Sequence, residues 1–232
     1  MDFRLTLQEE LARKNARDFA QKYVKPLAAE IDENHRFPEE TVKLMAEKGL
    51  MGIPYPKEYG GAGGNFLSYI LTIEELAKAC ASTAVICSAH SSLCCWCIYA
   101  WGTEEQRKEY LPDLCSGRHL GAFALTEANA GTDSAKQETK AVLDGDEWVF
   151  NGTKVFVTNG GYADVFVLFA MTDKSRGNRG ITAFLVRKDD PGLTIAKVEK
   201  KMGVWAWKKS TSWRRSSSPR RSRTSCLRWA AR

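Results

Sequence analysis

Residues 123–132 carry the groups in this sequence that are best suited to binding chemistry. A strand starting at Phe123 would offer peptide N–H groups along one edge, and Thr126 adds a hydroxyl. In the loop that follows, Gly131 has no Cβ, so the backbone can come close to a phosphate, and Thr132 adds a donor. Taken alone, the same loop also fits an ordinary β-turn with glycine at a positive φ. The surrounding sequence has to decide between a ligand loop and a turn.

A second candidate is Phe156-Val157-Thr158, which places an aromatic ring and a hydroxyl two residues apart in a predicted strand. The ring can cover one face of a flat ligand while the hydroxyl bonds to the ligand's edge. The alternative is a strand with phenylalanine in the core and threonine on the wet face.

The histidines and cysteines predict neither a catalytic triad nor a metal centre. His35, His90 and His119 are scattered, and we expect structural or surface roles for them. Six of the seven cysteines lie between residues 80 and 115, whereas a secreted disulfide framework would spread them between loops, so we expect reduced thiols. The cluster Cys94-Cys95-Trp96-Cys97 lacks a second Cys or His pair, which favours core packing over a metal.

The net positive charge of the chain comes from its last 29 residues. The chain of 232 residues has 34 Lys and Arg against 28 Asp and Glu, but residues 204–232 hold nine of the basic residues and no acidic one. The body is therefore mildly acidic, which argues against nucleic-acid binding outside the tail. The N-terminus has no apolar run of signal-peptide length, and no stretch approaches the roughly 20 apolar residues that span a bilayer. We expect a cytoplasmic protein without a membrane partner.

The elements that must position these residues fall into two zones. From Thr6 to about Gly117 the apolar residues recur at helical spacing, and Pro26 is expected to kink or end the first helix. Further helices are expected over 38–49, 66–80 and 83–100, with another starting at a Thr103 cap. Beyond Gly121 the pattern becomes strand-like at 148–150, 154–157, 165–169 and 181–186, with Asp-Gly, Asn-Gly and Gly-Gly as turn signals. The predicted class is α+β: an all-α helical domain (1–120), then a β-barrel-like middle domain (121–203).

Several motifs in order resemble the acyl-CoA dehydrogenases. Residues 123–134 and 151–161 resemble the flavin-embracing strands of that family, and 48–61 resembles part of its opening. The strings within 67–77 and 170–184 look most like the short-chain, butyryl-CoA branch. The similarity runs to about Gly203, so the C-terminal helical domain of the family is expected to be missing.

The resemblance implies FAD as cofactor, held by both candidate segments. The implied cofactor-binding residues are Phe123, Ala124, Leu125, Thr126, Glu127, Ala128, Asn129, Ala130, Gly131, Thr132, Phe156, Val157 and Thr158. Thr132 is implied to lie at the junction of FAD and the acyl-CoA thioester, and the Thr158 hydroxyl to bond the flavin's O4/N5 edge. Two positions depart from the family: Phe156 stands where many relatives have tryptophan, and Lys136 where the motif usually ends in a small residue.

The implied activity is the α,β-dehydrogenation of a short-chain acyl-CoA to the trans-2-enoyl-CoA. In the family the carboxylate that removes the α-proton comes from the C-terminal domain, so no catalytic residue is predicted in this chain. The implied partners are an electron-transfer flavoprotein and further copies of the chain, as a tetramer. An acyl-CoA oxidase, which passes its electrons to oxygen, is the alternative within enzymes.

Residues 204–232 form a basic, tryptophan-rich tail, with four of the seven tryptophans and no helical or strand periodicity. We expect this tail to be aberrant and disordered, because its composition cannot bury a core. A shifted reading frame after about Gly203 would explain the loss of acidic residues and the excess of tryptophan together. The alternatives are a non-catalytic fragment and a basic arm that binds nucleic acid.

Overall fold

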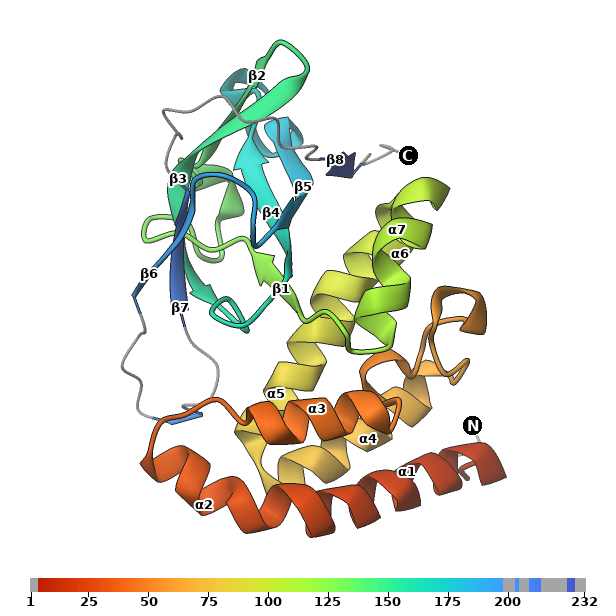
Figure 1. Cartoon of the computed structure of the whole chain (residues 1–232). Coiled ribbons are helices and arrows are strands. Elements are labelled where there is room, and N and C mark those ends of the chain that lie inside the picture. The colour runs from red at the N-terminus through yellow and green to blue at the C-terminus, as the bar shows by residue number, and fades with distance from the viewer. Residues whose placement is uncertain (1–3, 198–202, 205–208, 214–224, 228–232) are drawn as a thin grey trace.

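The computed structural model describes residues 4–197, 203–204, 209–213 and 225–227, as a helical part followed by a sheet (Figure 1). This order confirms the predicted α+β class. The helices are α1 (Leu7–Phe19), η1 (Ala20–Val24), α2 (Lys25–Glu33), α3 (Glu39–Glu47), η2 (Leu50–Gly52), η3 (Lys57–Tyr59), α4 (Phe66–Ala79), α5 (Ala81–Ser88), η4 (Ala89–Cys95), α6 (Trp96–Trp101) and α7 (Glu104–Cys115). The short helices η5 (Ser134–Lys136) and η6 (Lys174–Gly180) lie between strands.

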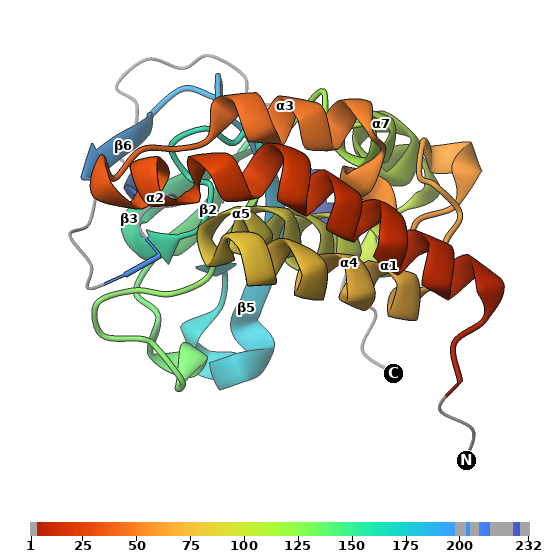
Figure 2. The same ribbon diagram turned by 90° about the horizontal axis from the view of Figure 1, so that it is seen from below.

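The first helix is longer than predicted, because Pro26 does not end it. A capping box of Thr6 and Glu9 starts α1. One π-helical segment, η1, then joins α1 to α2, and Pro26 falls in the first turn of α2, where a missing N–H is tolerated. Arg17 pairs at 2.9 Å with the buried carboxylate of Glu75, which holds α1 beside α4 on the underside of the helical part (Figure 2).

The helix formed by α5, η4 and α6 joins the helical part to the sheet. It spans Ala81–Trp101 and, contrary to the sequence prediction, is long and apolar enough to cross a membrane by length and composition alone. Of its most apolar window 61% is buried inside the protein, as in the core helix of a soluble fold. The Gly121 N–H donates to His90 Nδ1 at 2.9 Å, so His90 Nε2 carries the proton and donates to the Leu114 carbonyl at 3.0 Å. His90 is therefore a structural link between helices and sheet.

The cysteines that looked like a metal cluster lie in this core. Cys94, Cys95 and Cys115 are buried as free thiols among aromatic and aliphatic side chains. Within the described part of the chain, no group of three His, Cys, Asp or Glu residues is placed to hold a metal ion.

The sheet is mixed and centred on one strand, β4. Its strands are β1 (Gly121–Ala124), β2 (Lys140–Asp144), β3 (Glu147–Val157), β4 (Val165–Met171), β5 (Ile181–Arg187), β6 (Leu193–Lys197), β7 (Lys209–Trp213) and β8 (Ser225–Leu227). The order is β6-β7-β3-β2-β4-β5-β8, and β1 pairs in parallel with β4. On that edge of β4, β1 ends opposite Leu168 and β2 joins only at Met171. The chain between β1 and β2 therefore leaves the sheet at this junction.

The β part differs from the sequence prediction in several details, among them β6, which was not predicted. Asn151-Gly152 is not a turn but lies in the middle of β3. Glycine fits there because a Cβ at residue 152 would overlap Thr139 on the neighbouring segment. The exposed strand β2 was not predicted, since only Ala141 of its five residues is buried.

In the tail, residues 209–213 and 225–227 are strands rather than disordered: β7 lies between β3 and β6, and β8 pairs with β5. The rest of the tail prediction, apart from residue 204, concerns residues outside those described.

Candidate functional site

The two segments singled out in the sequence lie side by side. After β1 ends at Ala124, the chain passes through the junction between β1 and β2. The Val155 N–H donates to the Thr126 carbonyl at 2.8 Å, which joins this passage to β3 immediately before Phe156. The structure thus brings both predicted binding segments to one place on the sheet.

The thirteen predicted residues fall into three groups by exposure. Those that can meet a ligand with their side chains or open backbone are exposed: Ala128, Asn129, Gly131, Thr132 and Phe156. Partly exposed are Phe123, Leu125, Thr126 and Thr158. Four are buried and can contribute only through their backbone or by supporting their neighbours: Ala124, Glu127, Ala130 and Val157.

Gly131 occupies a position where the fold itself does not require glycine. Glu127 and Ala130 exchange backbone hydrogen bonds of 3.0 and 3.2 Å, which close a tight turn just before it. Gly131 is not among the glycines with positive φ, and a Cβ built on it meets nothing within 4 Å. The turn explanation for this glycine therefore fails, and the open backbone leaves room for the close approach of a ligand.

Phe156 has a backbone conformation that is rare for an aromatic residue. Its φ is 55° and its side chain is 59% exposed. A bulky residue at positive φ costs on the order of 1–3 kcal/mol, and such strain clusters at ligand sites. The register of β3 against β7 shifts between Lys154 and Val157, which inserts one extra residue. The ring is thereby turned outward beside the loop, where it can cover a flat ligand.

A buried ion pair lies beneath the loop. Lys154 Nζ contacts Glu127 Oε1 at 2.7 Å and also donates to the Leu125 carbonyl at 2.9 Å and to the Gln137 amide oxygen at 3.1 Å. Burial lowers the pKa of Lys154, and Glu127 opposes that effect. Burial alone would raise the pKa of Glu127, but the hydrogen bonds from Lys154 and from two peptide N–H groups outweigh it and lower the pKa. Glu127 is therefore a fixed carboxylate and not a free acid or base.

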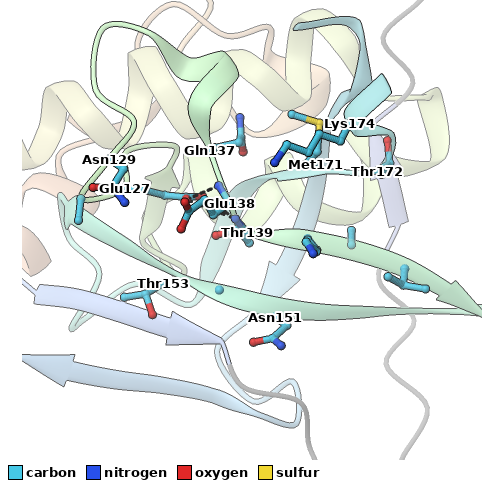
Figure 3. A pocket seen from close by; sticks show the side chains of 15 residues that line it. Glu127, Asn129, Gln137, Glu138, Thr139, Asn151, Thr153, Met171, Thr172 and Lys174 are labelled. Carbon is cyan, nitrogen blue, oxygen red and sulfur yellow. Dashed lines mark hydrogen bonds between the residues drawn. The ribbon is translucent and has the colours of Figure 1, made fainter. Parts of the chain in front are cut away.

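A hollow of about 700 Å³ opens beside Glu127 (Figure 3). It is walled by the loop residues near Glu127 on one side and by Met171, Thr172 and Lys174 on another. Thr139 Oγ1 is buried there and has no hydrogen-bond partner among the described residues. Lys140, Lys174 and Glu138 also line the hollow and leave it a net positive charge, because Glu127 is neutralised by Lys154. Such a polar, cationic hollow is suited to a phosphate-bearing ligand.

Sequence reasoning missed the supporting residues Lys154, Gln137 and Thr139. Lys154 was placed only in a strand, and Glu127 was named without a partner. A lysine within a run of apolar residues was the available signal, because a lysine that is buried must find an opposite charge. Which carboxylate it would meet depends on the junction between β1 and β2, which the sequence pattern does not contain.

Comparison with known proteins agrees with this architecture. The family model "Acyl-CoA dehydrogenase, N-terminal domain" matches residues 6–118, and "Acyl-CoA dehydrogenase, middle domain" matches residues 122–212. The second match extends past Gly203, where the sequence resemblance was expected to stop, and includes most of β7.

Among relatives, the short-chain specific acyl-CoA dehydrogenase of Clostridium acetobutylicum is 57% identical over 206 residues, which cover 89% of this chain and 54% of that protein. Butyryl-CoA dehydrogenase of Megasphaera elsdenii has a solved structure with a TM-score of 0.90 and 42% identity, over 93% of this chain and 57% of that one. A chain in a structure of the electron transferring flavoprotein of Acidaminococcus fermentans matches with a TM-score of 0.91 and 45% identity, over the same shares of the two chains. The chain thus spans little more than half the length of the relatives it matches. With both of its domains matched by the family's models, the chain belongs to the acyl-CoA dehydrogenase family.

Proposed function

We propose that this chain supplies the FAD- and acyl-CoA-binding portion of a short-chain acyl-CoA dehydrogenase. The proposed reaction converts a short-chain acyl-CoA, such as butyryl-CoA, to its trans-2-enoyl-CoA. The observation that carries the proposal is the exposed ring of Phe156, held at φ 55° beside a loop whose Gly131 has no structural reason to be glycine. The 57% identity to a short-chain specific relative supports the substrate class.

The residues present fit a flavin, and each has a definable task. Bound FAD would accept the substrate's β-hydride. The Phe156 ring covers one face of a flat cofactor, and the hydroxyls of Thr126 and Thr158 donate hydrogen bonds to its polar edge. Gly131 leaves the backbone open to a phosphate, and Thr132 lies where cofactor and thioester would meet. The adjacent hollow with Lys140 and Lys174 offers room for the phosphate-bearing end of the substrate.

We assign no catalytic base to the described residues. Asp133 lies in the loop itself, where it is exposed and pairs with Lys136 at 3.6 Å. Glu127 lies at the start of the loop, but Lys154 and the N–H groups of residues 138 and 139 hold it. A buried carboxylate that is held by three donors and paired with a lysine is not free to approach a substrate proton. The proposed base lies in the half of the relatives that this chain does not match.

The proposed partners follow from the similarity to known proteins. An electron-transfer flavoprotein would reoxidise the cofactor, as the likeness to a chain from an electron transferring flavoprotein structure supports. A homo-oligomer and a cytoplasmic location are also proposed. The oxidase alternative differs in one measurable property: rapid reoxidation of the substrate-reduced flavin by air. A nucleic-acid-binding tail would show as a salt-dependent shift of an oligonucleotide that deletion of 204–232 abolishes.

Titration of FAD into the purified 232-residue chain tests the proposal, with quenching of flavin fluorescence as the signal. We expect saturable quenching that Phe156→Ala weakens about ten-fold. The matched control is Phe66→Ala on α4, a ring of similar exposure at 49%, which should leave FAD binding unchanged. Equal effects of the two substitutions would mean that the flavin does not bind beside Phe156.

A further inference from the structure

The loop that carries Gly131 and Thr132 has no sheet partner of its own. It runs from the end of β1 at Ala124 to the start of β2 at Lys140, across the junction on the edge of β4. Its internal backbone bonds are local, within the turn of residues 127–130 and the short helix η5. At its two ends the Thr126 carbonyl accepts from the Val155 N–H of β3 and the Thr139 carbonyl accepts from the Met171 N–H of β4, both at 2.8 Å. Residues 127–138 between these two bonds are not paired with a strand, so side chains must set their position.

The Glu127 carboxylate joins the two ends of this loop. It stands at the loop's beginning and accepts hydrogen bonds from the peptide N–H groups of Glu138 at 2.6 Å and Thr139 at 3.0 Å, at the loop's end. Figure 3 shows these bonds crossing the base of the loop. Both carboxylate oxygens accept hydrogen bonds, so the Glu127 side chain ties the beginning of the loop to its end.

Lys154 connects the Glu127 carboxylate to β3. Its ammonium group has three N–H donors and three acceptors: Glu127 Oε1, the Leu125 carbonyl and the Gln137 side chain. Gln137 in turn donates to the Ser134 carbonyl at 3.1 Å, inside the loop. One buried charge on the strand of Phe156 therefore holds both ends of the loop that faces the ring.

Stability alone does not explain a buried ion pair at this position. Replacing such a pair with apolar side chains of similar volume is often neutral or stabilising, because desolvation offsets the attraction between the charges. What an apolar pair cannot reproduce is a fixed direction: here, donors and acceptors set the loop relative to β3 within hydrogen-bond tolerance.

We infer that Lys154 and Glu127 are positioning residues, which hold the loop of residues 128–136 against β3 so that Gly131, Thr132 and Phe156 face one ligand together. The inference deepens the proposed function and rests on it for the identity of that ligand. The loop's order, however, can be measured without any ligand.

The test uses the 232-residue chain with Glu127→Gln and Lys154→Met combined, which removes both charges while keeping side-chain size and one acceptor oxygen. Hydrogen exchange, thermal unfolding and FAD affinity are measured on the same samples. We expect a melting temperature close to the parent's, amide exchange about ten-fold faster within residues 128–139 and unchanged in α3, and FAD affinity reduced about ten-fold. Lys108→Met is the control, because it removes an exposed ion pair with Glu104 on α7.

Each outcome bears on the inference. Unchanged loop exchange and FAD affinity in the double variant would overturn it, and so would faster exchange in every element together with a lower melting temperature, which marks a purely structural pair. If the double variant does not fold, Lys154→Met alone is compared in the same way, because Glu127 then keeps its two peptide N–H donors. If the parent chain fails to bind FAD, the proposed function is lost, while the exchange of residues 128–139 still decides whether the pair orders the loop.

Discussion

Alanine substitution at two glycines should separate a functional from a structural requirement for glycine. Gly131 lies in the exposed loop and Gly152 lies in the middle of β3, and neither has a positive φ. A Cβ at Gly131 meets nothing within 4 Å, whereas a Cβ at Gly152 would overlap the side chain and backbone of Thr139. The same added methyl group is therefore free at one position and obstructed at the other.

The expected sizes follow from these contacts. Overpacking at Gly152→Ala should cost about 1–3 kcal/mol, and for a chain of this length each kcal/mol lowers the melting temperature by about 2–4 °C. A fall of roughly 2–12 °C is expected. Gly131→Ala should change stability by no more than about 0.5 kcal/mol, but its methyl group would stand between the backbone and a bound phosphate. A loss of about 1.4 kcal/mol there corresponds to a ten-fold weaker FAD affinity.

Thermal unfolding followed by circular dichroism and FAD titration followed by flavin fluorescence give both quantities for both variants. We expect Gly131→Ala to lose FAD affinity at an unchanged melting temperature, and Gly152→Ala to lose stability. If Gly131→Ala binds FAD like the parent chain, the ligand explanation for this glycine is refuted. If it is as destabilised as Gly152→Ala, the loop has packing that the structure does not contain.

Three further predictions concern single side chains and the chain as a whole. In a chain that binds FAD, Thr158→Val should perturb the flavin absorbance spectrum and Thr132→Ala should weaken ligand binding. Each substitution removes one hydrogen bond to the ligand, worth about 1–3 kcal/mol of binding free energy; normal spectra and titrations would contradict both. The Arg17 hydrogen bond lowers the pKa of Glu75 to about 2, so this carboxylate stabilises the fold above its unfolded pKa near 4.5 and loses that effect as pH falls towards 2. Melting temperatures measured from pH 6 to 2 should therefore fall less steeply in Glu75→Gln than in the parent. The 232-residue chain should show no dehydrogenase activity towards butyryl-CoA, because no described residue is assigned as base; bleaching of bound flavin by butyryl-CoA without oxygen would contradict this.

The sequence predicts the helical part well, because its signals are local. The Thr103 cap depends only on neighbouring residues, and it is found where it was expected. Pro26 was misjudged because the π-helical segment before it, which accommodates the proline, leaves no mark in the apolar spacing. Gly152 was misjudged for a related reason: an Asn-Gly pair signals a turn only when no neighbouring segment needs the space.

The candidate site was predictable in its exposed residues and not in its support. Gly131, Thr132 and Phe156 stand out by residue type and by resemblance to a family motif. Lys154 and Glu127 are 27 residues apart, and their contact exists only because β1 leaves β4 just before β2 joins it. A pairing of strands distant in sequence cannot be read from local periodicity.

The strain at Phe156 and the burial of Lys154 have one common cause. In a regular strand, residues two apart share a face, so a buried Lys154 would require a buried Phe156. The positioning role inferred for Lys154 requires the lysine to point inward, and the proposed flavin contact requires the Phe156 ring to point outward. The extra residue in β3 resolves this conflict, since it puts Val157, three positions after the lysine, on the buried side in place of Phe156. The positive φ at Phe156 is thus the local strain that comes with a buried lysine and an exposed ring two residues apart. Strain of this kind is typical of ligand sites, in agreement with the proposed site.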